Sequence, residues 1–127
     1  MNGVQRPERG EFARLVEEAL DAIPAEFARY LDNVSVVVEE EPTRALLREL
    51  GLDPRRDTLY GVYQGVPLPE RSHDFTGLPD RIVLFAGPLA RDFPTRARLR
   101  REIAATVVHE VAHFFGLDDD RIRRLGF

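Results

Sequence analysis

The chain of 127 residues contains no cysteine, no lysine and no tryptophan, and only three histidines. The lack of cysteine excludes disulfide bonds, thiolate metal sites and a cysteine nucleophile. Any metal ion would therefore be held by histidine, aspartate, glutamate or water. Because lysine is absent, all 18 basic side chains are arginines, which we interpret as a coding bias and not as a functional device.

Long apolar runs are also missing. The most apolar stretch, residues 103–117, is 15 residues long and contains two histidines and one glutamate. A membrane-spanning helix needs about 20 apolar residues, so this stretch predicts a buried helix instead. The first ten residues lack the apolar segment of a secretory signal peptide, so we expect a cytoplasmic protein with no membrane partner.

The overall composition is that of a folded globular protein, with 43% hydrophobic and 31% charged residues. The length fits one core, so we expect residues 1–127 to form a single domain. The net charge of −4 argues against a nucleic-acid partner, which usually requires a basic surface. The arginines within residues 96–101 have acidic residues nearby and indicate a solvated helix face.

Hydrophobic spacing predicts alternating helices and strands. Apolar residues three and four positions apart, with proline or threonine at the start, predict helices. These helices cover residues 11–22, 24–31, 42–50 and 95–115. Runs of β-branched and aromatic residues predict strands over residues 34–39, 58–66 and 81–85. With a proline-rich surface loop at residues 67–80, this order predicts an α+β (mixed α/β) domain.

The strand and helix ends carry further expectations. Residues 34–39 are rich in valine, so we expect a buried strand, whereas glycines around residues 58–66 suit a strand near the sheet edge. Gly87 and Pro88 are expected to close the third strand. Gly116 is expected to end the long helix in a left-handed conformation.

The long predicted helix contains the segment His109-Glu110-Val111-Ala112-His113. On a helix, two histidines four residues apart lie on one face and can bind one metal ion through their imidazoles. Glu110 projects to the side of that face, where it can contact a metal-bound water without being a ligand. Zinc lowers the pKa of such a water to about 7, and a carboxylate can then accept its proton. The spacing is that of the HExxH metallopeptidase motif.

The alternative is that His109, Glu110 and His113 are polar residues that fall on one helix by chance. Their neighbours are almost all apolar, so they would be partly buried, at a cost of about 2–7 kcal/mol for each unpartnered polar group. A metal ion would satisfy them together. Gly116 and Asp119 extend the segment to HExxHxxGxxD, which adds weight to the metal site.

Residues 106–119 carry this extended motif and resemble the minimal zincins, small bacterial zinc proteases with a minimal metalloprotease-like domain. Residues 61–68 and 78–82 support the resemblance, which covers roughly the last hundred residues of the chain. The resemblance implies a mixed sheet packed on a long active-site helix. It also implies that His109 and His113 are zinc ligands and that Glu110 is the general base.

The third zinc ligand implied by the resemblance is Asp119. Its neighbours Asp118 and Asp120 are alternatives that could also reach the ion. The aspartate ligand departs from the larger metzincin pattern, and so does the lack of a methionine turn, since the only methionine is Met1.

Three residues outside the motif are candidates for substrate binding. His73 lies in the predicted loop and could approach a substrate oxyanion, although a lone histidine on a polar loop is usually solvated. Tyr60 and Tyr63 could donate a hydrogen bond there, although strand tyrosines more often pack. Residues 59–64 could bind an extended peptide by strand addition.

Together these features predict a zinc-dependent metallopeptidase acting on a peptide or protein substrate. A zinc-polarised water would attack the peptide bond with Glu110 as general base. One alternative is a zinc-stabilised binding module without significant catalysis, in which four protein ligands would close the metal site. The other is an arginine-rich nucleic-acid-binding domain, whose binding would fall steeply with salt.

Overall fold

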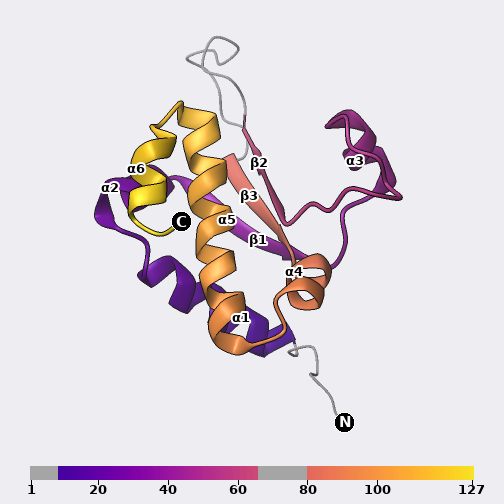
Figure 1. The fold of residues 1–127 in the computed structure, drawn as a ribbon, viewed down its shortest axis with the longest axis horizontal. Coiled ribbons are helices and arrows are strands. Elements are labelled where there is room, and N and C mark those ends of the chain that lie inside the picture. The colour runs from indigo at the N-terminus through magenta and orange to yellow at the C-terminus, as the bar shows by residue number, and fades with distance from the viewer. Residues whose placement is uncertain (1–8, 66–79) are drawn as a thin grey trace.

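The fold is built on a three-stranded mixed sheet with a long helix lying across one of its faces (Figure 1). The computed structural model describes residues 9–65 and 80–127. Strand β1 (Val34–Glu39) runs parallel to the central strand β3 (Asp80–Phe85), and β2 (Gly61–Gln64) runs antiparallel to β3. Strand β2 is therefore an edge strand, as predicted.

Helices make up the rest of the regular structure in the described ranges. They are α1 (Arg9–Asp21), α2 (Ala25–Ala28), the 3-10 helix η1 (Arg29–Leu31), α3 (Arg44–Glu49), α4 (Ala86–Asp92), α5 (Arg96–Phe115) and α6 (Asp119–Arg124). The α+β class is confirmed, and so is the predicted order of strands and helices. Helices α4 and α6 were not predicted.

Strand β3 ends at Phe85, just before Gly87 and Pro88 as predicted, but these residues lie in α4, which begins directly at Ala86. Proline is tolerated there because the first turn of a helix has no partner for its N–H groups. Gly87 instead allows a close approach, since its N–H donates to the Glu40 carbonyl at 2.8 Å. Strand β1 was expected to be buried, but it is half-buried because it forms the other sheet edge among the described strands.

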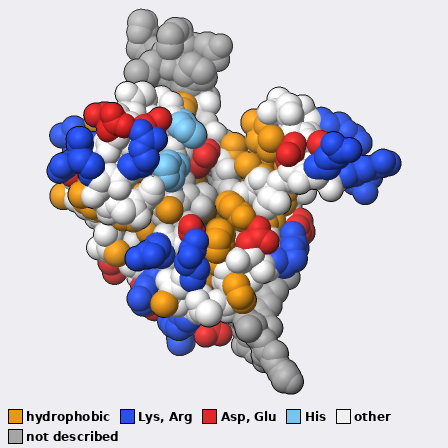
Figure 2. All heavy atoms as spheres, in the orientation of Figure 1, with side chains coloured by type: hydrophobic (Ala, Val, Ile, Leu, Met, Phe, Trp, Pro, Cys, Tyr) orange, Lys and Arg blue, Asp and Glu red, His pale blue; other side chains and the backbone are white. Residues whose placement is uncertain are grey.

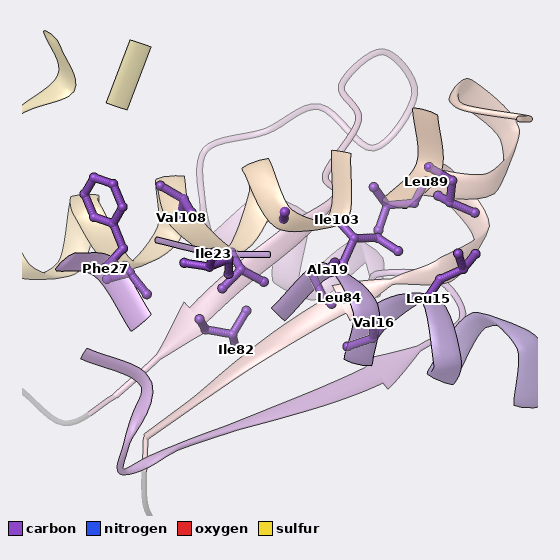
Figure 3. Packing of buried hydrophobic residues seen from close by; sticks show 14 of the residues in the cluster. Leu15, Val16, Ala19, Ile23, Phe27, Ile82, Leu84, Leu89, Ile103 and Val108 are labelled. Atoms are coloured by element: carbon purple, nitrogen blue, oxygen red, sulfur yellow. The ribbon is translucent and has the colours of Figure 1, made fainter. Parts of the chain in front are cut away.

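The main core lies between the sheet, α1 and α5 (Figure 3). Ile82 and Leu84 of β3 point to this face, where the side chains of both helices cover them. The large side chains of the two helices that are fully buried are Leu15, Ile103, Val107, Val108 and Val111. Complete burial of one such side chain contributes about 1.5–3 kcal/mol. Val83 and Phe85 point to the opposite face and form a smaller cluster with Val62.

Helix α5 positions the motif by burying one stripe of its surface. Thr95 caps its start by accepting from the Arg98 N–H, and Gly116 ends it with a φ of 67°. The buried residues recur at three- and four-residue intervals, namely Leu99, Ile103, Ala104, Val107, Val108, Val111 and Ala112. Because this stripe faces the core, His109, Glu110 and His113 are left on the other side of the helix.

Gly61 allows β2 to approach α5 closely, and the fold should not tolerate a larger residue there. A Cβ at this position would lie 2.7 Å from Thr106 Cγ2 and 3.0 Å from the Val83 carbonyl oxygen. We therefore predict that Gly61→Ala lowers the free energy of unfolding by about 1–3 kcal/mol, the usual cost of overpacking. Urea unfolding measures this change.

The matched control is Gly10→Ala in α1, where a Cβ would meet nothing within 4 Å. This variant should be neutral or slightly stabilised, because alanine favours a helix over glycine by up to about 1 kcal/mol. Equal stability of Gly61→Ala and the wild type would contradict the close approach of β2 to α5.

Candidate functional site

Two successive turns of α5 present His109 and His113 side by side, with their ring centroids 6.5 Å apart. His109 is half-buried and His113 is exposed. In Figure 2 the histidines of the described residues form one pale-blue patch on the surface. Two imidazoles in this arrangement supply nitrogen ligands of the kind that zinc prefers.

Glu110 points from the same helix toward β2. Its Oε1 accepts a hydrogen bond from the Tyr63 backbone N–H at 2.9 Å. Burial raises the pKa of the Glu110 carboxyl above its ordinary value of 4.5, against the opposing effects of the Tyr63 N–H, His113 and His109. A carboxylate with a raised pKa is better suited to take up a proton during a reaction near neutral pH.

The hydrogen-bond pattern of the sheet explains why the Tyr63 N–H is available to Glu110. The Phe85 N–H donates to the Tyr60 carbonyl at 2.9 Å, so these two residues form a hydrogen-bonded pair. Such pairs alternate along an antiparallel ladder, and the residues between them direct their N–H and C=O groups away from the partner strand. Gly61 and Tyr63 occupy those positions. The outer edge of β2 therefore faces Glu110.

The side chain of Tyr63 is held away from Glu110. Its hydroxyl donates to Asp80 Oδ2 at 2.7 Å, and its ring stacks on Phe114 with centroids 4.0 Å apart. The group of Tyr63 that contacts Glu110 is thus its backbone amide, whereas the sequence had indicated the phenol as a possible donor to a substrate oxyanion. No side-chain pattern in the sequence could have indicated this contact. A role of Tyr63 in substrate binding stays a prediction.

A second contact that the sequence did not indicate involves His109. Its Nε2 lies 3.0 Å from the backbone carbonyl oxygen of Phe127. Because a carbonyl only accepts hydrogen bonds, Nε2 is the donor in this contact, and in the neutral ring the lone pair then lies on Nδ1. Metal-binding histidines commonly donate their second ring N–H to a backbone carbonyl, which fixes the tautomer. The carbonyl of Phe127 is placed for such an orienting role.

The three consecutive aspartates after Gly116 differ in their partners. Asp118 caps α6 by accepting from the Asp120 N–H at 2.9 Å, and Asp120 pairs with Arg123. Asp119 is exposed at the first position of α6 and has no hydrogen-bond or ion-pair partner among the described residues. Of the three carboxylates, Asp119 is the one that a metal ion could engage without breaking another interaction.

The donor types around α5 fit zinc, but no closed ligand set is formed. Within residues 9–65 and 80–127, no three histidine, aspartate or glutamate side chains are grouped so as to hold one metal ion. Ligation by His109, His113 and Asp119 therefore stays a prediction. His73, the other candidate for substrate binding, lies outside the described residues.

A cavity of about 370 Å³ opens beside the motif, between the start of β2 and α5. It is lined by His109 and Glu110 together with Tyr60, Phe93 and Glu102, among others. A larger cavity of about 540 Å³ lies between α1 and the first half of α5, but no residue of the HExxH segment lines it. The smaller cavity is therefore the one that adjoins the HExxH segment.

Residues 31–127 match a protein family described as zincin-like metallopeptidase. The matched region includes every element from β1 to α6, and thus the sheet, α5 and the HExxH segment. No curated protein matches the chain. In the part of the chain that the structure describes, no helix is both long and apolar enough to cross a membrane.

We predict that Glu110→Gln stabilises the metal-free protein at neutral pH. Burial raises the folded-state pKa of Glu110. Between pH 4.5 and this raised pKa, the native state therefore binds more protons than the unfolded state does. The contribution of Glu110 to stability is thus fully present below pH 4.5 and is lost as the pH rises through the raised pKa. Glutamine avoids this loss and still offers an oxygen to the Tyr63 N–H.

Thermal unfolding in the presence of a chelator measures the effect. The melting temperature of Glu110→Gln should exceed that of the wild type at neutral pH, and the two should converge below pH 4.5. Glu17→Gln, at an exposed position of α1, is the control for removing one negative charge. A lower melting temperature for Glu110→Gln at neutral pH would show that the carboxylate is stabilising.

Proposed function

Because the chain belongs to the zincin-like metallopeptidase family, we propose that it hydrolyses peptide bonds with a zinc ion held by His109 and His113. The observation that carries this proposal is the hydrogen bond between Glu110 and the outer edge of β2. It places the candidate general base next to a strand edge that can bind an extended peptide. The substrate would then lie over the residues that act on it.

The proposed ligands come from two adjoining helices. His109 and His113 supply imidazoles from α5, and Asp119 supplies a carboxylate from the start of α6. Asp119 is preferred to Asp118 because the Asp118 carboxylate already caps α6. When bound, zinc would polarise the peptide carbonyl and lower the pKa of a water molecule toward about 7.

Glu110 would move the proton. Its carboxylate accepts a proton from the attacking water and returns it to the amine that leaves as the peptide bond breaks. The raised pKa favours uptake of this proton, and the Tyr63 N–H holds the carboxylate in one orientation. The folded protein has already removed part of the hydration shell of the ionised Glu110 carboxylate. Protonation of Glu110 during the reaction therefore sacrifices less hydration than protonation of an exposed carboxylate would.

The substrate would bind extended, as an added strand. Gly61 directs its N–H and C=O away from β3, and thus toward a peptide lying along the outer edge of β2. Thr106 of α5 takes up the space beside the Gly61 Cα, so the peptide would follow the strand edge. The cavity beside Glu110 would accept a side chain of the bound peptide.

We predict that Glu110→Gln and Glu110→Ala lower kcat/KM by about 10²–10⁴-fold, the usual contribution of general acid–base assistance. Bound zinc should be unchanged, because Glu110 contacts the water and not the ion. Digestion of a broad peptide library, followed by mass spectrometry, measures hydrolysis, and metal analysis after dialysis measures zinc.

The charge-matched control is again Glu17→Gln, which should retain full activity. A loss smaller than about tenfold in the Glu110 variants would exclude Glu110 as the general base. Zinc retained by a wild-type protein that cleaves no member of the library would favour a zinc-stabilised binding module instead.

We predict that Asp119→Ala weakens zinc binding by at least about 100-fold, because loss of even an outer-shell partner commonly costs 10–100-fold. Asp118→Asn and Asp120→Asn are the matched controls. Asparagine at position 118 preserves a capping oxygen for α6, so its fold should remain intact. Competition with a zinc-chelating dye measures the affinities. Loss of zinc in either control, with tight binding by Asp119→Ala, would reassign the third ligand.

A further inference from the structure

The cavity beside Glu110 has aromatic side chains on one wall and a carboxylate on the other. The rings of Tyr60 and Phe93 contact each other, with centroids 5.3 Å apart. Glu102 of α5 also lines the cavity, and its side chain retains 21% of its accessible surface. The cavity therefore has two features. Its aromatic faces suit an aliphatic stem or a cation, and its carboxylate is mostly removed from solvent.

Negative charge dominates around the Tyr60 hydroxyl. This hydroxyl donates to Asp92 Oδ2 at 2.5 Å, so a second carboxylate lies directly behind the aromatic wall. Burial, the hydrogen bond to Asp92 and the charges of Asp92 and Glu102 together raise the pKa of Tyr60 to about 12. The nearby Arg91 is already paired with Glu41. Glu102 lines the cavity and Asp92 lies behind its aromatic wall, so two carboxylates act on the cavity.

Arg98 lies outside the lining of this cavity, but its contacts show that Phe93 and Glu102 can together hold a guanidinium. Its guanidinium lies over the Phe93 ring, 5.3 Å from the centroid, and its Nη2 is 3.9 Å from Glu102 Oε1. A distance of 3.9 Å is too long for a hydrogen bond. The Glu102 carboxylate has no closer side-chain partner among the described residues, so its capacity to accept hydrogen bonds is left for a ligand.

We propose that this cavity binds a basic side chain of the substrate, and that Glu102 is the residue that selects it. The proposal rests on the proposed peptidase function. The aliphatic stem would pack against Tyr60 and Phe93, and the cation would pair with Glu102. Arginine is favoured over lysine, because its planar guanidinium can also stack on aromatic rings.

Other side chains fit this cavity less well. An apolar side chain would remove water from Glu102 without offering it a partner, and an unpaired buried charge is costly. An acidic side chain would be repelled by Glu102 and Asp92. Arg98 offsets one negative charge, but it does not line the cavity, and 56% of its side-chain surface is accessible to solvent.

The position of Glu102 also fixes where the basic residue lies in the substrate. Glu102 and Glu110 are eight residues apart on α5, which corresponds to about 12 Å along the helix. An extended peptide advances about 3.3 Å per residue, so the basic residue falls about three to four residues from the scissile bond. One peptide can therefore occupy the cavity and reach Glu110 together.

The experiment compares the hydrolysis of peptides that contain arginine with that of otherwise identical peptides that contain citrulline, a neutral isostere of arginine. For zinc-loaded wild-type protein, we predict that kcat/KM is at least about tenfold higher for the arginine peptide. In Glu102→Gln the ratio should fall toward one, because the selecting charge is gone while the shape is kept. In Glu17→Gln the ratio should remain at the wild-type value.

A binding measurement separates this proposal from the peptidase proposal. N-acetyl-arginine amide and N-acetyl-citrulline amide are titrated into Glu110→Gln protein, while NMR follows the Tyr60 and Gly61 amide signals. Tighter binding of the arginine compound, lost in the double variant Glu102→Gln/Glu110→Gln, supports the basic pocket even without any hydrolysis. Hydrolysis by the wild type with equal rates for both peptides, or with a preference for norleucine or glutamate, would overturn the basic pocket and leave the peptidase intact.

Discussion

The hydrogen bond from the Tyr63 N–H to Glu110 joins the sheet edge to the long helix, and the geometry of the site depends on it. It can form only because Gly61 lets β2 approach Thr106 on α5. The alternation of the antiparallel ladder then directs the N–H two residues further along toward the helix. A packing constraint at one residue thereby fixes the orientation of a carboxylate that would otherwise be free to rotate.

The burial of Glu110 favours its proposed role as a proton acceptor but lowers the stability of the fold. Burial of Glu110 raises its pKa, so the ionised carboxylate weakens the folded state at neutral pH while becoming a better proton acceptor. The apolar stripe of α5 offsets that cost, because Ile103, Val107 and Val111 are almost completely buried against α1 and the sheet. Close packing of the apolar face of α5 therefore offsets the destabilisation caused by Glu110 on the other face.

Local signals in the sequence predicted the helix that carries the site, but they did not predict the contacts between residues far apart in the sequence. The Thr95 cap, the Gly116 end and the apolar spacing predicted α5, so the placement of the motif on one helix followed from local chemistry. Helix α4 was missed because Gly87 and Pro88 look like a turn, whereas Gly87 is required by the approach of Glu40. The contact of the Phe127 carbonyl with His109 involves backbone atoms, which carry no residue-specific signal.

The two carboxylates of α5 lie on the side of the helix that faces away from the main core, and their surroundings differ. Glu110 accepts a backbone N–H and is mostly buried, whereas Glu102 faces the cavity with the Arg98 guanidinium 3.9 Å away. Between them lie Ala105 and Thr106, whose small side chains leave the cavity open, and the Thr106 hydroxyl is turned back to the Glu102 carbonyl at 2.8 Å. Because the two acids are about two helical turns apart, the charge proposed to select a side chain can change without altering the carboxylate proposed to move the proton. With these proposed roles, substrate preference and catalysis would vary independently on a single helix.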